Sequence, residues 1–170
     1  MTDTRTAPSP VRPVAQEQLF GFAPEEVRLD EPTRAARLKW VVVVDGSLPP
    51  GRAANAAACV AAATSRQVTG LVADGGLDAD GSPHAGLPWA GCTVLTADPA
   101  TLRSVHDRAR RRDDVLVVDM PLLAQETRVY AEFLARLAQV PGDEISYAAV
   151  GVVGPRRSVD RIVGGLPLLT

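Results

Sequence analysis

Two charged residues placed after predicted buried strands are the best candidates for chemistry in this chain. Asp119 follows the unbroken apolar run of residues 115–118, and Arg52 comes shortly after the run of residues 40–44. Ligands of open α/β sheets bind outside the carboxyl ends of strands, so an acid in this place is typical of a site. Arg52 stands at a predicted helix start, where the helix dipole disfavours a cation. Each also has a plainer explanation, since Asp119 can cap a helix ahead of Pro121 and Arg52 can be a surface arginine.

The two loops that carry these residues, 47–52 and 119–127, define the expected site. In it Asp119 would orient a water or an amine, and Arg52 would stabilise the oxyanion that develops on a carbonyl substrate. The residues expected to bind the substrate lie in the first loop and the first turn of the helix after it: Ser47, Pro50, Gly51 and Asn55.

Motifs for other chemistries are missing from the sequence, which has no GxGxxG, no P-loop lysine, no GxSxG and no paired zinc ligands. Asp74, Asp78 and Asp80 suggest calcium, but an EF-hand loop needs a glutamate six residues after its glycine, and Leu87 stands there. This segment is therefore interpreted as a turn, and neither a cofactor nor a metal is expected.

The two cysteines, Cys59 and Cys92, both lie in apolar stretches, which predicts buried free thiols in a reducing compartment. The sequence has no amino-terminal apolar segment typical of a signal peptide and no run of 18 apolar residues. We therefore expect a cytoplasmic protein with no membrane partner.

Arginines gather at the end of one predicted helix and at the start of the last one: Arg111, Arg112, Arg156 and Arg157. Cations are favourable at a helix carboxyl end, which is the simple explanation for the first pair, and a phosphate-binding patch is the alternative. The net charge of −2 does not favour a nucleic-acid partner, although a local patch leaves tRNA open.

Strands alternate with helices along the chain, which predicts one α/β domain with a four-stranded sheet. Residues 1–36 read as an extension, partly disordered or packed on the domain of residues 37–170, with an apolar patch at residues 19–22. The apolar tail at 166–169 should dock back on the domain. The expected strands are 40–44, 92–96, 115–118 and 147–153. One expected helix begins at residue 52, and three others span 99–112, 121–140 and 157–163.

Two segments carry a resemblance to a known family. The first runs from Lys39 through the valines to Gly51, Arg52 and the alanines, and the second from Gly151 through Gly154-Pro155 to Leu168. Together they resemble the peptidyl-tRNA hydrolase II family, and residues from about 38 to 170 look like the uncharacterised bacterial proteins of that superfamily. The resemblance implies a mixed four-stranded sheet flanked by helices, here with an inserted helix before the last strand, and a homodimer.

The resemblance also implies roles for individual residues. The family's lysine of the glycine loop falls on Arg52, its aspartate on Asp119 and one threonine on Thr127, displaced by the inserted helix. A second threonine falls on Ala149 and a histidine on Cys59, so two polar groups of the family are replaced. Arginine keeps the positive charge of the lysine but stays protonated at any working pH.

Three functions follow from these observations. The first is a hydrolase or acyl-transfer enzyme for a small ester or amide, with Arg52, Asp119 and Thr127 as catalytic residues. The second is an aminoacyl- or peptidyl-tRNA hydrolase, whose phosphate contacts would make binding weaken steeply with salt. The third is a non-catalytic ligand-binding protein that keeps the pocket.

Overall fold

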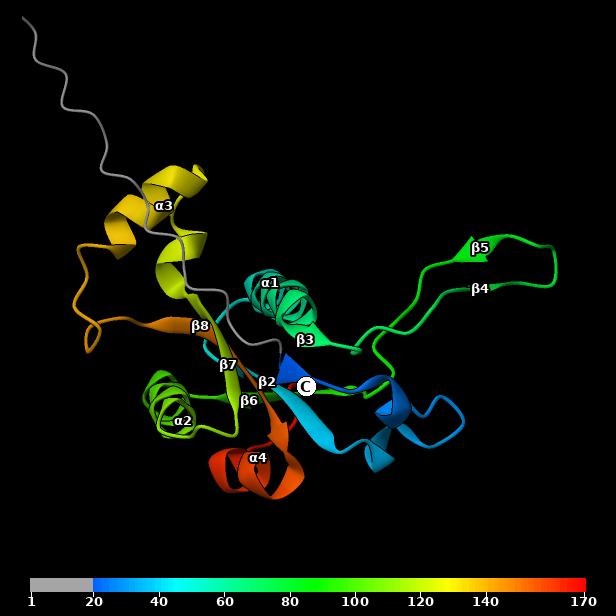
Figure 1. Ribbon diagram of the computed structural model, residues 1–170. Helices are drawn as coiled ribbons and strands as arrows, with labels where there is room; N and C mark the ends of the chain where they lie inside the picture. The colour runs from blue at the N-terminus through cyan, green and yellow to red at the C-terminus, as the bar shows by residue number, and fades with distance from the viewer. Residues whose placement is uncertain (1–19) are drawn as a thin grey trace, which may run out of the picture.

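A four-stranded mixed sheet forms the centre of the protein, in a computed structural model that describes residues 20–170 (Figure 1). The strand order is β6-β2-β8-β7, with bounds β2 Leu38–Asp45, β6 Cys92–Ala97, β7 Leu116–Pro121 and β8 Tyr147–Pro155. β2 pairs with β6 in parallel, and β8 runs antiparallel to both β2 and β7. The carboxyl ends of β2, β6 and β7 therefore lie at the same end of the sheet as the start of β8.

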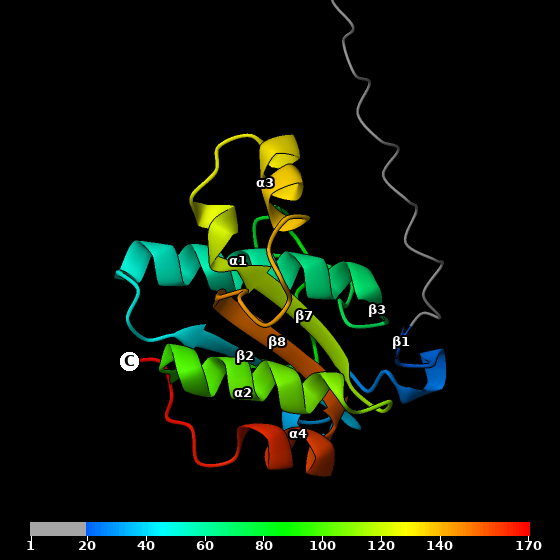
Figure 2. The same ribbon diagram turned by 90° about the vertical axis from the view of Figure 1, so that its left-hand side faces the viewer.

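Helices cover both faces of this sheet. α1 (Pro50–Gln67) packs on one face, and α2 (Pro99–Arg110) and α4 (Arg156–Val163) lie side by side on the other (Figure 2). The valines of β2 explain the arrangement, because alternate residues point to opposite faces and Val41 to Val44 are all buried. The prediction of a single α/β domain with a four-stranded sheet is confirmed.

The helices α1 and α2 begin within two residues of the predicted positions. Pro49 and Pro50 fix the start of α1, and Asp98 caps α2 by accepting hydrogen bonds at 3.0 Å from the backbone N–H groups of Ala100 and Thr101. Gly151 lets α1 lie close to β8, since a Cβ there would come within 2.6 Å of the Val60 side chain.

The amino-terminal part of the described residues packs on the same domain. Phe20–Gly21 (β1) pairs in parallel with Val68–Thr69 (β3), and the buried Phe22 ring lies 4.9 Å from that of Trp89. Two 3-10 helices, η1 Pro24–Glu26 and η2 Thr33–Ala35, lead to β2. Leu19, also part of the predicted apolar patch, lies outside the described residues.

The prediction of one continuous helix over residues 121–140 is wrong. The segment forms a 3-10 helix, η3 (Leu122–Gln125), and a separate α-helix, α3 (Tyr130–Leu137). Pro121 belongs to β7, and the extended backbone of Val129 (φ −112°, ψ 122°) interrupts the helix. No residue of α3 is buried, so the expected core stripe is absent from it.

The turn predicted at residues 75–81 forms the tip of a two-stranded ribbon. β4 (Gly76–Leu77) pairs antiparallel with β5 (Pro83–His84), and the ribbon extends away from the sheet (Figure 1). We call residues 73–87 the β4–β5 arm.

Candidate functional site

Asp119 lies within β7 and faces α2. Its neighbours Val118 and Met120 pack under α1, so the alternation of the strand directs Asp119 to the opposite face. There its Oδ2 atom lies 3.3 Å from Nε2 of His106, a residue of α2. Asp119 is therefore not the helix cap that the sequence also allowed.

His106 stands between two carboxylates. Its Nδ1 atom lies 3.2 Å from Oδ1 of Asp107, and Nε2 faces Asp119. The ring also stacks on that of Tyr147, with centroids 4.3 Å apart, and its side chain is only 12% exposed. A neutral imidazole can donate through one nitrogen and an imidazolium through both, so the ring can fix the orientation of the Asp119 carboxylate.

Tyr147 forms the floor of this cluster at the start of β8. Burial raises the pKa of its hydroxyl, and the negative charge of Asp119 raises it further. The Arg103 guanidinium lies 5.6 Å from the centre of the Tyr147 ring and partly offsets this effect. The phenol therefore stays protonated at neutral pH and is available as a hydrogen-bond donor.

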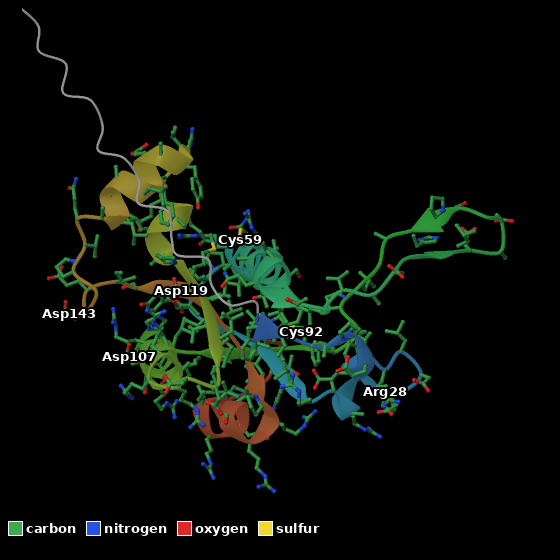
Figure 3. All side chains as sticks on the ribbon, in the orientation of Figure 1. Arg28, Cys59, Cys92, Asp107, Asp119 and Asp143 are labelled. Carbon is green, nitrogen blue, oxygen red and sulfur yellow. The ribbon has the colours of Figure 1, made fainter. Side chains whose placement is uncertain are left out.

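Asp119 also lines a pocket of about 390 Å³ beside the β7 edge. The pocket extends from Asp119 to Cys59 on the outer side of α1, as their positions in Figure 3 show. Thr127 and Arg128 contribute the other polar side chains, and the remaining walls are mostly apolar: Met120, Pro121, Ala124, Val129, Tyr130 and Phe133. The Thr127 hydroxyl donates a long hydrogen bond of 3.4 Å to the Leu123 carbonyl.

The structure does not bring Arg52 and Asp119 into one crevice. Arg52 belongs to α1, on the other face of the sheet, and its Nε donates to Oε1 of Gln125 at 2.8 Å. The Gln125 amide in turn donates to the Arg52 carbonyl at 2.8 Å and to Oδ1 of Asn55 at 3.1 Å. Arg52 and Asn55 therefore hold η3 against α1, and neither lines the pocket.

The other residues expected to bind substrate lie near the ends of β2 and β6. Ser47 lines a separate open hollow with Thr96, Asp98 and Thr101, and its hydroxyl donates at 2.7 Å to Oδ1 of the buried Asp45. Pro50 and Gly51 are exposed at the start of α1. The predicted site thus separates into Asp119 and Thr127 in the pocket and the remaining residues outside it.

The four arginines of the predicted phosphate patch differ in their surroundings. Arg112 donates to Asp114 at 2.9 and 3.0 Å and to the Ser158 hydroxyl at 2.9 Å, which ties the end of α2 to α4. Arg156 donates to the Arg34 carbonyl. Arg111 and Arg157 make no side-chain hydrogen bond to residues 20–170, and both are exposed.

The prediction of buried thiols is wrong, because Cys59 and Cys92 are both exposed, although both are free. The buried positions of α1 are Ala53, Ala56, Val60 and Thr64, and this spacing turns Cys59 outward into the pocket. The alanines on every side of the helix conceal that face in the sequence.

His106, Arg128 and Tyr147 were not selected from the sequence. His106 had a detectable signal, because it lies four residues after Leu102 and one after Val105, on the side of α2 that faces the core. A polar side chain on a core-facing side is informative. Arg128 had no signal, since its place depends on the break between η3 and α3.

A model of the family described as "Protein of unknown function (DUF2000)" matches residues 38–170. The chain belongs to this family. A solved structure of Atu0240 from Agrobacterium tumefaciens strain C58, described as a protein of unknown function, has a TM-score of 0.73 and 19% identity. The match covers 79% of this chain and 98% of that one, and at this identity it supports the fold alone. No curated protein matches the chain.

Residues 20–170 contain neither a metal-binding cluster nor a membrane-spanning helix. No group of three histidine, cysteine or acidic side chains is placed to hold a metal ion in this range. Within the same residues no helix has the length and apolar character required to cross a membrane.

Proposed function

We propose that this DUF2000 protein is a hydrolase or acyl-transfer enzyme with a peptidyl-tRNA hydrolase II-like fold, acting on a small ester or amide. The observation that supports this most is the contact between Asp119 and His106 at one end of a largely apolar pocket. A carboxylate oriented in this way is suited to act as a general base, and the apolar walls beside it can hold the apolar part of a substrate.

Asp119 is the proposed base in the reaction. It accepts a proton from a water molecule, or from the amine or alcohol acceptor in acyl transfer, as the attacking atom bonds to the carbonyl carbon. When the tetrahedral intermediate collapses, the C–O or C–N bond breaks and the leaving group takes the proton from Asp119. His106 does not touch the substrate and positions the carboxylate.

Arg128 and Thr127 are the proposed electrophilic side of the site. Both line the pocket with Asp119, so a guanidinium and a hydroxyl are available to the carbonyl oxygen when it becomes negative. This role replaces the one expected for Arg52, whose guanidinium is bound to Gln125. The apolar walls favour an apolar acyl group, and the volume of about 390 Å³ favours a small substrate.

The test is turnover of a panel of N-acyl amino-acid esters and amides by the purified full chain. Asp119→Asn should lower kcat by about 10²–10⁴-fold, because the amide cannot accept the proton. Asp143→Asn is the matched control, since Asp143 is an exposed aspartate outside the pocket (Figure 3). Unchanged turnover in Asp119→Asn would refute the proposed base. A ligand bound equally by both proteins, with no turnover of any substrate, would establish the non-catalytic alternative.

A second candidate is hydrolysis of the ester in aminoacyl- or peptidyl-tRNA. The contact of Arg112 with Ser158 favours it, because it places the exposed Arg111 and Arg157 at neighbouring helix ends. Binding of N-blocked aminoacyl-tRNA should then weaken steeply as salt rises. Arg111→Ala with Arg157→Ala should reduce that slope, and a flat salt dependence would exclude this candidate.

A further inference from the structure

The β4–β5 arm is a projection with a fixed base, and its tip packs against no other element within residues 20–170. Its base lies in the core, where Leu71 is buried and Nε1 of Trp89 donates to the Gly70 carbonyl at 2.7 Å. Beyond the bridge between Val72 and Pro88 the arm leaves the body of the protein. The core therefore fixes the direction in which the arm points.

The arm is well formed internally. Asp78 accepts hydrogen bonds from the backbone N–H groups of Asp80 and Ser82 at 3.0 and 2.8 Å. Gly75 and Gly86 allow the two strands to lie very close, since a Cβ on either would fall within 2.1 Å of a carbonyl oxygen across the ribbon. A defined conformation of this kind requires a surface to pack on, because an isolated two-stranded ribbon is marginally stable in water.

The side chains of the arm have the composition of a contact surface. Leu77 and Leu87 are 72% and 74% exposed, and every residue from 74 to 85 is exposed. The arm also carries Asp74, Asp78 and Asp80, and no lysine or arginine occurs between residues 66 and 103. The arm thus combines exposed leucines with a negative charge.

A second unpartnered element, α3, lies on the opposite side of α1. None of its residues is buried, and Tyr130 at its start is 75% exposed. An eight-residue helix is unstable in isolation, so α3 also requires a surface. Together with Val129 and Arg128 it borders the pocket that contains Asp119.

The arm and α3 rise on either side of α1 (Figure 1). The exposed positions of α1 include several alanines. We propose that a second copy of the chain packs over α1, so that the arm of each copy covers the α3 pocket of the other. A two-fold axis parallel to α1 exchanges the two sides of the molecule, so each copy then gives one arm and receives one. Ala54, Ala58 and Ala62 are the exposed small residues of α1 that allow this close approach.

The two surfaces are chemically complementary. Leu77 offers an apolar side chain to the Val129, Tyr130 and Phe133 walls of the pocket, and the arm aspartates approach Arg128. The opposite charges steer the two copies together, and the buried leucine contributes most of the stability of the contact. The apolar patch near the amino terminus is not part of this interface, because Phe22 is buried in its own domain.

The partner's arm would cover the pocket beside Asp119 and exclude water from it. This catalytic consequence rests on the proposed function, whereas the dimer itself is tested without any substrate. If the protein is not an enzyme, the dimer measurements are unaffected. If the protein is a monomer, the Asp119→Asn turnover assay still tests the chemistry of Asp119.

Sedimentation of the full chain over a concentration series tests the dimer. The unmodified protein should sediment as a dimer, and Leu77→Asp should raise the dissociation constant by about tenfold or more. Leu29→Asp is the matched control, because Leu29 is 63% exposed and lies outside the arm and the pocket. A monomer at every concentration, or a Leu77→Asp protein that dimerises as tightly as the control, would overturn the proposal.

Crosslinking tests where the arm is placed. Leu77→Cys in a Cys92→Ser background should give a covalent dimer with a short bis-maleimide, because the introduced thiol lies near the exposed Cys59 of the partner pocket. Adding Cys59→Ala should remove that product. A covalent dimer that persists without Cys59 would show that the arm meets a different surface and would overturn the assignment.

Discussion

The two edges of the central sheet differ in how they are covered. At the β6 edge the carboxyl-terminal tail adds a short antiparallel segment, with Leu95 bridged to Leu168 and hydrogen bonds from Thr96 N to Pro167 O and from Leu169 N to Val94 O. At the β7 edge no further strand pairs within residues 20–170, and the chain turns through η3 and α3 around the pocket.

We expect the covered β6 edge to contribute mainly to stability and the β7 edge mainly to function. An open strand edge invites pairing with other chains, and proteins commonly cover it. The tail gives the β6 edge that cover, while the β7 edge is bordered by a pocket, a carboxylate and an exposed helix. Changes at the β7 edge should therefore alter activity more than stability, and changes at the β6 edge the reverse.

After Asp119 itself, the largest effect is expected at His106, the positioning residue of the β7 edge. His106→Ala should lower kcat by about 10–100-fold with little change in KM, because Asp119 loses the group that orients it. Steady-state kinetics measures both kcat and KM.

Two variants separate positioning from packing at His106. His106→Gln retains an N–H donor and should recover part of kcat, whereas Arg110→Ala, an exposed change on the same helix, should leave the rate unaltered. Equal losses in the alanine and glutamine variants would mean that His106 acts only by filling space against Tyr147.

Removing the tail should be the largest stability change and should leave turnover intact. Deletion of residues 166–170 removes the two backbone hydrogen bonds and the packing of Leu166, which together stabilise the fold by about 2–3 kcal/mol. Urea unfolding measures this, with deletion of Thr170 alone as the control. A loss of activity equal to that of His106→Ala would contradict the separation between the edges.

The β6 side of the molecule was largely predictable from the sequence. Valines 41–44 predict a strand buried on both faces, Asp98-Pro99 predicts a helix start, and the apolar residues 166–169 predict a docked tail. In each case local backbone preferences and burial agree, so short-range patterns are sufficient.

The β7 side was predictable only in part. The strand and Asp119 were recognised, but apolar residues from Leu122 to Leu137 suggested one buried helix where the chain breaks at Val129 and remains exposed. The partner of Asp119 was also misassigned, because the pairing with His106 depends on which face of the sheet each residue occupies. Sequence spacing does not determine that face for residues on different elements.

A smaller effect is expected where η3 is held against α1. Gln125→Ala removes three hydrogen bonds to Arg52 and Asn55, but the side chains are exposed, so the cost should be about 1 kcal/mol. The pocket wall should loosen, which should raise KM more than it lowers kcat. Gln139→Ala, an exposed glutamine whose side chain makes no hydrogen bond to residues 20–170, is the control. A change in stability without a change in KM would show that η3 does not shape the substrate pocket.

The smallest effect concerns stability at the other end of the β7 edge, and it should disappear in acid. Arg112 and the Ser158 hydroxyl hold the pKa of Asp114 at about 2, below its ordinary value of 3.8. A depressed folded pKa stabilises the protein above the ordinary value, and this contribution is lost as the pH falls toward 2. Asp114→Asn should therefore lower the Tm at pH 6, and the difference from the unmodified protein should vanish near pH 2. Because the Asp114 side chain is 42% exposed, solvent screens the pair and the shift should be small. A Tm difference that stays constant from pH 6 to pH 2 would show that packing of Ser158, and not the charge of Asp114, ties α4 to this edge.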